Sequence, residues 1–282
     1  MADWDVAIIG GGAAGLSAAA AAAGSGLSCL VIDRMGGGGE LMNLGTLHDM
    51  DESLTGPDLF ARLMEQATEA GAELGIAEVT GLTQAQTGWR IATDDESHTA
   101  RAVILATGLA PGTLGLHNEA AFEGQGLSHC AACDGPLYAG QPVVVAGAGR
   151  WAIAEARELA QIASEVTLVA QGAPGPAAET FTILPGRIAA LEGASGLESV
   201  LVQTAGATPQ RLPAHAIFVQ TGRRPALGFA PEAMARDADG RPITDWAHQT
   251  NLPGLFAVGP HETLTEAIAN GRRAAALGKG AA

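Results

Sequence analysis

Short apolar runs that lead into glycine-rich segments recur along this chain. Residues 5–9 form an apolar run suited to a buried parallel strand, and they continue into residues 10–15, which are mostly glycine. An alanine-rich stretch follows to about residue 23, and residues 28–32 form a second apolar run that ends on Asp33. Strand, helix and strand in this order predict one complete βαβ unit.

The same order returns in the middle of the chain. Residues 142–146 are apolar and are followed by a second glycine segment, residues 147–149. A helical stretch to about residue 163 and a strand over 166–169 complete the second unit. Two such units predict an α/β protein with two Rossmann-like domains.

The remaining pattern predicts a helix that starts within Leu54–Pro57, with Pro57 at a tolerated early position, runs to about Ala70 and stops at Gly71. Further strands are expected at 89–91, 103–105, 216–219 and 255–258, and a last helix at about 264–277.

The first glycine segment has the spacing of a dinucleotide-binding turn. Gly10 allows the tight turn, Gly12 lets the backbone approach a pyrophosphate, and Gly15 lets the helix pack on the strand. The helix N-terminus favours phosphate charge, and Asp33 can accept a hydrogen bond from a ribose hydroxyl. The alternative is a glycine-rich turn without a ligand.

Cys130 and Cys133 are separated by two residues, a spacing that lets two sulfurs close a small ring and lets one thiolate have a lowered pKa. Asp134 follows and can move a proton during thiol–disulfide exchange. A zinc site with His117 and His129 and a pair of inert buried thiols are the alternatives. We expect no metal, and we interpret Cys29, in the middle of a strand, as a core residue.

Length, charge and composition limit the number of domains, the partners and the location that we expect. The 282 residues carry a net charge of −15 and suffice for one large domain or two of ordinary size. This charge argues against nucleic-acid and anionic-membrane partners, which require a basic surface. The acidic residues 1–5 do not resemble a signal peptide, and the apolar residues 13–23 are too short to cross a bilayer. We therefore expect a cytoplasmic protein.

Together the motifs resemble the low-molecular-weight thioredoxin reductases over nearly the whole chain. The residues that carry the resemblance are Gly10–Gly15, Gly38–Leu41, Leu54–Pro57, Ala106–Gly108, Cys130–Gly135, Gly147–Gly149, Thr221–Pro225 and Pro253–Gly259. The resemblance implies two Rossmann-like domains of the three-layer ββα type. A discontinuous FAD domain would span 1–112 and 246–282, and a cysteine-carrying, degenerate NAD(P)H-type domain would span 113–245.

The resemblance also implies site residues. Cys133 would face the flavin, Cys130 would attack the substrate disulfide, and Asp134 would be the acid and base. The implied FAD-binding residues are Gly10, Gly12, Ala13, Ala14, Gly15, Asp33, Arg34, Gly39, Glu40, Leu41, Thr107, Gly108, Gly259, Glu266 and Ala267.

The sequence departs from the family where NADPH would bind. The family has a His-Arg-Arg run after the strand that here ends at Val169, whereas residues 170–176 carry no positive charge and no acid for the ribose of NADH. Trp151 stands in the turn where small residues are usual and can fill the space of a pyrophosphate. The alternative is that NADPH binds by another geometry, through Arg187, Arg211 or Arg223.

The FAD-binding part of the sequence also differs from the family pattern. Pro260 stands where the family has an Asp that holds the ribityl chain, and Thr265–Glu266 replaces an Arg-Gln pair. FAD is still expected, and the N-terminus of the last helix can stabilise negative charge on a reduced flavin.

The sequence thus predicts an FAD-dependent thiol–disulfide oxidoreductase that does not use NADPH directly. Its substrate would be a thioredoxin-like protein or a small dithiol or disulfide. Electrons would come from ferredoxin or pass to oxygen, and the enzyme would be a homodimer. The alternatives are an ordinary NADPH-dependent thioredoxin reductase and a non-catalytic flavin or redox-sensing module.

Overall fold

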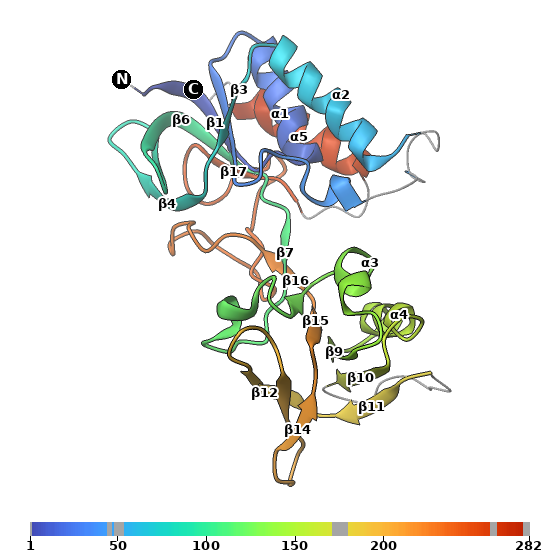
Figure 1. Ribbon diagram of the computed structural model, residues 1–282. Coiled ribbons are helices and arrows are strands. Elements are labelled where there is room, and N and C mark those ends of the chain that lie inside the picture. Colours follow the sequence, from blue (N-terminus) through green and yellow to red (C-terminus); the bar gives the residue numbers. More distant parts are fainter. Residues whose placement is uncertain (1, 44–46, 48–53, 171–179, 260–263, 279–282) are drawn as a thin grey trace. The chain divides into compact units, whose positions relative to one another are not determined.

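The computed structural model describes residues 2–43, 47, 54–170, 180–259 and 264–278, which form two compact units (Figure 1). The first unit is Met1–Leu109 with Pro225–Ala282, and the second is Ala110–Arg224. The sequence-based boundary after residue 245 is therefore about twenty residues too late. Residues 225–245 belong to the first unit because Leu227, Ala230 and Met234 are buried in its core.

The first unit is built on a sheet whose central strands are parallel, in the order β3-β2-β1-β6, with β17 beyond β6. The start of β6 pairs antiparallel with β5, which pairs with β4. The strands are β1 (Trp4–Ile9), β2 (Cys29–Asp33), β3 (Glu73–Ile76), β4 (Val79–Gln84), β5 (Trp89–Thr93), β6 (Ser97–Leu105) and β17 (Leu255–Ala257).

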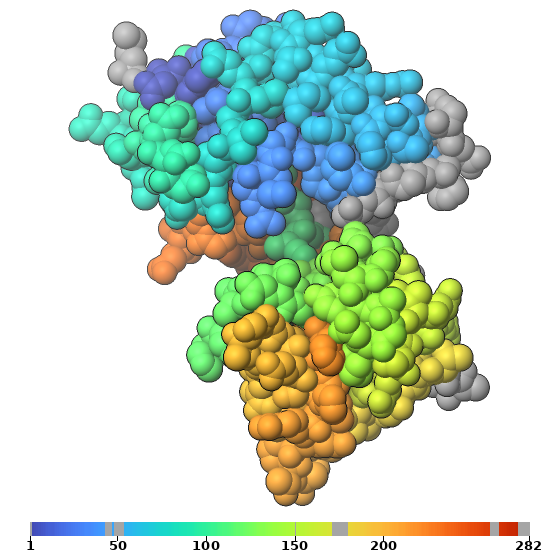
Figure 2. All heavy atoms as spheres, in the orientation of Figure 1, coloured from blue at the N-terminus to red at the C-terminus, as the bar shows by residue number. Residues whose placement is uncertain are grey.

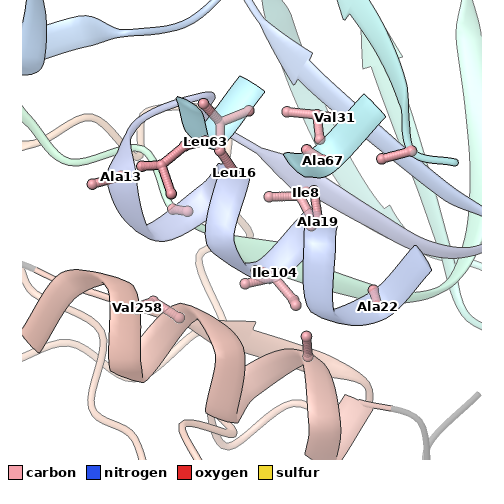
Figure 3. Close-up of a cluster of buried hydrophobic side chains, with 14 of the residues drawn as sticks. Ile8, Ala13, Leu16, Ala19, Ala22, Val31, Leu63, Ala67, Ile104 and Val258 are labelled. Atoms are coloured by element: carbon pink, nitrogen blue, oxygen red, sulfur yellow. The ribbon is translucent and has the colours of Figure 1, made fainter. Parts of the chain in front are cut away.

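Three helices cover one face of this sheet, α1 (Ala13–Gly24), α2 (Gly56–Glu69) and α5 (Leu264–Gly278), and η1 (Gly39–Asn43) is a short 3-10 helix (Figure 1). The alanines of α1 allow close packing: a side chain at Gly271 of α5 would collide with the carbonyl oxygen of Ala14. Figure 3 shows this core, with Leu16 and Ala19 of α1 beside Ile8 and Ile104 of the sheet.

α2 begins where the sequence predicts, because the side chain of Thr55 and the carboxylate of Asp58 cap each other's backbone N–H groups. On the opposite face of the sheet, Trp89 and Ile91 of β5 are buried against residues 227–234. This unit therefore has three layers.

The second unit repeats the architecture. Its parallel sheet, in the order β11-β10-β9-β15-β8, consists of β8 (Leu127–Ser128), β9 (Pro142–Gly147), β10 (Glu165–Ala170), β11 (Thr182–Pro185) and β15 (Ala216–Gln220). α4 (Arg150–Leu159) covers one face, and an antiparallel sheet of β12 (Arg187–Glu192), β13 (Ser199–Gln203) and β14 (Gln210–Pro213) covers the other.

The short elements of this unit are α3 (Ala131–Asp134), η2 (Glu119–Phe122) and η3 (Gly135–Tyr138). The chain leaves the first unit through β7 (Leu109–Pro111) and returns through β16 (Arg223–Pro225), and these two strands pair with each other.

The α/β class and both βαβ units agree with the sequence-based predictions. The antiparallel strands β12–β14 were not predicted. β13 alternates buried and partly exposed residues, as Val200 and Val202 show, whereas β14 has no buried residue, and the apolar runs of all three strands are short.

Candidate functional site

The first glycine turn, between β1 and α1, is held in a conformation that requires glycine. Gly10 has φ of +108°, and a side chain there would collide with the carbonyl oxygen of Ala106. A side chain at Gly15 would collide with the carbonyl oxygen of Gly10. At Gly12 the space is open, and no side chain caps the start of α1, so the N-terminal N–H groups can face a bound anion.

Asp33, at the end of β2, organises the neighbouring loop. Its Oδ2 accepts the backbone N–H of Gly11 at 2.8 Å, and its Oδ1 accepts those of Met35 at 2.9 Å and Gly37 at 3.0 Å. A carboxylate accepts about four hydrogen bonds, so Asp33 can accept one more, as from a ribose hydroxyl.

A cavity of about 200 Å³ opens beside Asp33. The residues lining it are Gly11, Leu16, Val31, Asp33, Gly36, Met64, Leu74, Gly75 and Ile76. Asp33 alone of these is a predicted FAD-binding residue, and Met64, Gly75 and Ile76 are among those that the sequence-based site lacks. Gly75 and Ile76 lie on β3, which has no long apolar run, so only the pairing of β3 with β2 reveals their place.

A second cavity lies at the carboxyl ends of β6 and β17. Thr107, Gly108 and Gly259, all predicted FAD-binding residues, line it together with Leu227 and Pro242. The structure thus brings residues from three distant stretches of the chain to the same edge of the sheet. Pro260 lies outside the described residues.

The other predicted FAD-binding residues fall into two groups. Arg34, Gly39, Glu40 and Glu266 are exposed. The side chains of Ala13, Leu41 and Ala267 are buried in the core that also contains α1, so these three offer a ligand mainly backbone atoms, and the partly buried Ala14 packs against the same core. Gly38 donates its N–H to the carbonyl oxygen of Gly11 at 2.9 Å, which ties the loop of Gly39 to the glycine turn.

Cys130 and Cys133 form a disulfide at the start of α3, with 5.3 Å between their Cα atoms. Cys130 is the N-cap of this helix, and its Sγ accepts the backbone N–H of Cys133 at 3.2 Å. Cys133 is exposed and Cys130 partly so, which makes the disulfide accessible within this unit.

Asp134 lies beside the disulfide and is held by Ser128, whose hydroxyl donates to Asp134 Oδ2 at 2.6 Å. The same hydroxyl oxygen accepts the backbone N–H of Cys130 at 3.1 Å. Sequence reasoning missed Ser128 and also Glu155 of α4, which bonds the backbone N–H of Ala131. Ser128 is only two residues before Cys130, and this spacing was the available signal.

Cys29 contrasts with the pair. It is fully buried in β2, and this burial raises the pKa of its thiol to about 12. Because the thiolate is the reactive form, Cys29 is inert at neutral pH, in agreement with its interpretation as a core residue.

The second glycine turn, between β9 and α4, differs from the first at the helix N-cap, where Gly12 of the first turn has φ of −82°. Gly149 has φ of +84°, and no side chain caps α4. The indole of Trp151 is 67% exposed, so it lies at the surface of this turn and is not packed in the core. Arg211, one possible NADPH ligand, is paired with Glu192 at 2.9 Å. Residues 171–176 lie outside the described residues.

Two further findings concern the described parts of the chain. No three His, Cys, Asp or Glu residues there are grouped so that they could hold a metal ion. None of the helices described has both the length and the apolar character needed to cross a bilayer.

Comparisons with known proteins place these features in context. Residues 4–174 match the family described as pyridine nucleotide-disulphide oxidoreductase. A thioredoxin reductase of Treponema pallidum is 33% identical over 276 residues, with 91% of this chain and 88% of that protein covered. The crystal structure of Lactococcus lactis thioredoxin reductase is similar, with a TM-score of 0.79, 26% identity and 99% of each chain covered. A ferredoxin-flavin thioredoxin reductase from Clostridium acetobutylicum has a TM-score of 0.55 and 25% identity, with 98% of this chain and 96% of that chain covered.

Proposed function

This chain belongs to the pyridine nucleotide-disulphide oxidoreductase family as an FAD-dependent enzyme of the thioredoxin reductase type, and we propose that Cys130 and Cys133 are its redox pair. The observation that carries the proposal is the exposed disulfide between these residues at the start of α3, with Asp134 beside it. The pair exchanges two electrons with an external dithiol or disulfide.

The first unit fits the cofactor. The turn at Gly10–Gly15 offers N–H groups to a pyrophosphate, Asp33 can accept from a ribose hydroxyl, and the cavity beside Asp33 has room for part of a nucleotide. We assign Thr107, Gly108 and Gly259 to the same cofactor because they line the second cavity at that edge of the sheet. FAD, when bound, supplies the two-electron couple that interconverts the disulfide and the dithiol.

The chain's own residues carry out the exchange with the substrate. In the reducing direction, the Cys130 thiolate attacks one sulfur of the substrate disulfide, and the other substrate sulfur leaves as a thiolate and takes a proton. The Cys133 thiolate then attacks Cys130 Sγ, which closes the internal disulfide and releases the second substrate thiol. Asp134, held by Ser128, donates and accepts the protons of these steps.

We propose that NADPH does not reduce this enzyme directly. A 2′-phosphate needs cationic partners, each worth about 1.5–3 kcal/mol, and residues 170–176 offer none. Losing two such contacts weakens binding by roughly 10²- to 10⁴-fold. The pairing of Arg211 with Glu192 removes one of the three arginines that could substitute.

The electron partner is then a protein or oxygen. The similarity to a protein whose title calls it a ferredoxin-flavin thioredoxin reductase favours ferredoxin as donor and a thioredoxin-like protein as substrate. The second candidate is a dithiol oxidase, in which the pair oxidises a substrate dithiol and the electrons pass to oxygen.

Anaerobic reduction of the purified yellow protein tests the redox pair. Dithiothreitol is expected to bleach the flavin or to produce a long-wavelength thiolate-to-flavin absorbance band. Cys133→Ser should remove this band, whereas Cys130→Ser should strengthen it. Cys29→Ser is the control and should behave like the parent. If all three variants react like the parent, the pair does not serve the flavin.

Addition of single donors tests the electron source. NADPH and NADH should reduce the flavin slowly or not at all, whereas reduced ferredoxin should reduce it promptly. Rapid and saturable NADPH oxidation would establish an ordinary NADPH-dependent thioredoxin reductase. Prompt reduction by dithiothreitol alone, with fast reoxidation by oxygen, would favour the dithiol oxidase. Binding of FAD with no exchange in either direction would indicate a redox-sensing module.

The proposal also includes a homodimer in the cytoplasm. Light scattering of the FAD-loaded protein should give about twice the mass of one chain. A monomer that turns over at the full rate would contradict this part of the proposal alone.

A further inference from the structure

We propose that Glu155 is a positioning residue of the redox pair. Its carboxylate anchors the first residue of the cysteine-bearing helix α3, and its negative charge opposes a thiolate on Cys130 once the disulfide is open. This inference rests on the proposed role of Cys130 and Cys133 and assigns a role to a residue on a different helix.

The contact itself is short and lies between two elements. Glu155 Oε2 accepts the backbone N–H of Ala131 at 2.7 Å, across 24 positions of sequence. Ala131 is only 1% exposed and packs with Ala152 and Ala156 of α4. An unpaired N–H at such a buried position is destabilising, so Glu155 stabilises the docking of α3 on α4.

Besides Glu155, Ser128 of β8 bonds the backbone N–H of Cys130 and the carboxylate of Asp134, and two further hydrogen bonds lie within the turn itself. Cys133 donates its N–H to Cys130 Sγ at 3.2 Å, and Asp134 donates its N–H to the carbonyl oxygen of Cys130 at 3.1 Å. Opening the disulfide removes the covalent link between Cys130 and Cys133, but it leaves the bond from Ala131 to Glu155 in place. Glu155 can therefore hold the turn in both redox states. In Figure 2, α3 and α4, coloured green to yellow-green, form one continuous surface.

The titratable groups around Cys130 come from α3, from α4 and from the residues just before the turn. Asp134 lies on α3 itself, Glu155 and Glu158 lie on α4, and His129, before Cys130, contacts Glu123 through Nε2 at 3.2 Å. Burial raises the pKa of the Glu155 carboxyl, the N–H of Ala131 lowers it, and the charge of Glu158 raises it. Glu155 thus places a half-buried carboxylate next to the residue that follows Cys130, where it raises the free energy of a thiolate.

The test is the pH dependence of Cys130 alkylation in full-length, FAD-loaded protein carrying Cys133→Ser. After anaerobic reduction with dithiothreitol and its removal, iodoacetamide modification of the Cys130 peptide is followed by mass spectrometry from about pH 5 to 9.5. Glu155→Gln keeps an acceptor oxygen for Ala131 and removes the charge. This substitution should lower the midpoint of the pH profile of Cys130 alkylation by about half a pH unit to one pH unit. Below that midpoint, alkylation should be about three- to tenfold faster than in the parent.

Glu158→Gln is the matched control, because it removes the same charge from an exposed position of the same helix. It should leave the midpoint within about 0.2 units of the parent, since an exposed charge is screened by solvent. An unchanged or raised midpoint in the Glu155→Gln variant, with FAD content and thermal unfolding like the parent, would overturn the role of the charge.

Hydrogen exchange of the peptide that contains α3 tests the anchor separately. Glu155→Ala should accelerate exchange at Ala131 by about tenfold, whereas Glu155→Gln should not. Equal exchange in the parent and the Ala variant would overturn the anchor. Neither measurement involves electron transfer to the flavin. A shifted midpoint in a protein whose cysteines do not reduce the flavin would therefore uphold this inference and reject the proposed function.

Discussion

The two βαβ units of this chain share one backbone plan and differ in the side chains at the ends of their strands. In each, a parallel strand leads through a glycine turn into a helix without a side-chain cap. β2, the second strand of the first βαβ unit, ends on Asp33, which organises the loop that follows. β10, the second strand of the other βαβ unit, ends on the buried Ala170.

A second difference lies at the helix. Gly15 stands where α1 passes so close to the turn that a side chain would collide with Gly10. The equivalent position of α4, counted from Gly147, is Ala152, which carries a methyl group. The comparison teaches that the fold requires neither an acid at the end of the second strand nor a glycine at this helix position, because the parallel sheet and its helix are stabilised by apolar burial.

The largest expected effect is on the close approach at Gly15. Gly15→Ala gives α1 the residue that α4 has naturally, and the collision with Gly10 should weaken FAD binding by about 30- to 150-fold. The measurement is the ratio of flavin to protein after gel filtration, with a titration of the apoprotein. Ala152→Gly is the matched control and should leave this ratio unchanged. A fully loaded Gly15→Ala protein would show that the two turns are equivalent.

Asp33→Asn tests the side chain that distinguishes the end of β2 from the end of β10. The amide retains one oxygen but turns an N–H donor toward a backbone donor, so FAD affinity should fall by about tenfold. Asp237→Asn is the control, because Asp237 also accepts two backbone N–H groups, those of Asp239 and Arg241, each at 2.9 Å. The control should retain the parent's FAD affinity, and equal losses in both variants would point to general destabilisation.

The pH dependence of stability at Cys29 allows a comparison of β2 with β10. The folded thiol stays protonated up to about 12, whereas an unfolded thiol ionises near 9.0, so unfolding releases a proton between these values. Stability should therefore fall as the pH rises through this window, by up to about 1.4 kcal/mol at pH 10 from this residue.

Cys29→Val should remove this part of the alkaline slope, because Val166 occupies the matching position of β10. Val166→Cys should introduce a similar slope in the second unit. Urea unfolding at pH 8 and pH 10 measures both. Identical slopes in the parent and Cys29→Val would mean that the Cys29 thiol does not titrate differently in the folded state.

The smallest effect is expected at Trp151. Trp151→Ala removes an exposed indole from the second glycine turn but adds no cation for a 2′-phosphate. Flavin reduction by NADPH should therefore remain within about twofold of the parent. Saturable reduction by NADPH in this variant would show that the indole, and not the missing charge, blocks the nucleotide.

Much of the fold follows from local patterns. The runs at 5–9 and 142–146 with their glycine turns predict both βαβ units, and Thr55 with Pro57 marks the start of α2. The antiparallel strands β12–β14 have no such signal, because their stability comes from the apolar face that they share with the second parallel sheet. The place of residues 225–245 likewise depends on burial of Leu227 and Met234 in the first unit.

By itself, the sequence determined the glycine turns, the spacing of Cys130 and Cys133 and the absence of cations after β10, since these are properties of neighbouring residues. Only the tertiary structure decided that Asp33 binds three backbone N–H groups, that Met64 and Ile76 line its cavity and that Glu155 holds Ala131. The physical reason is that a hydrogen bond acts over about 3 Å. Partners far apart in the chain reach that distance only when packed helices and strands bring them together.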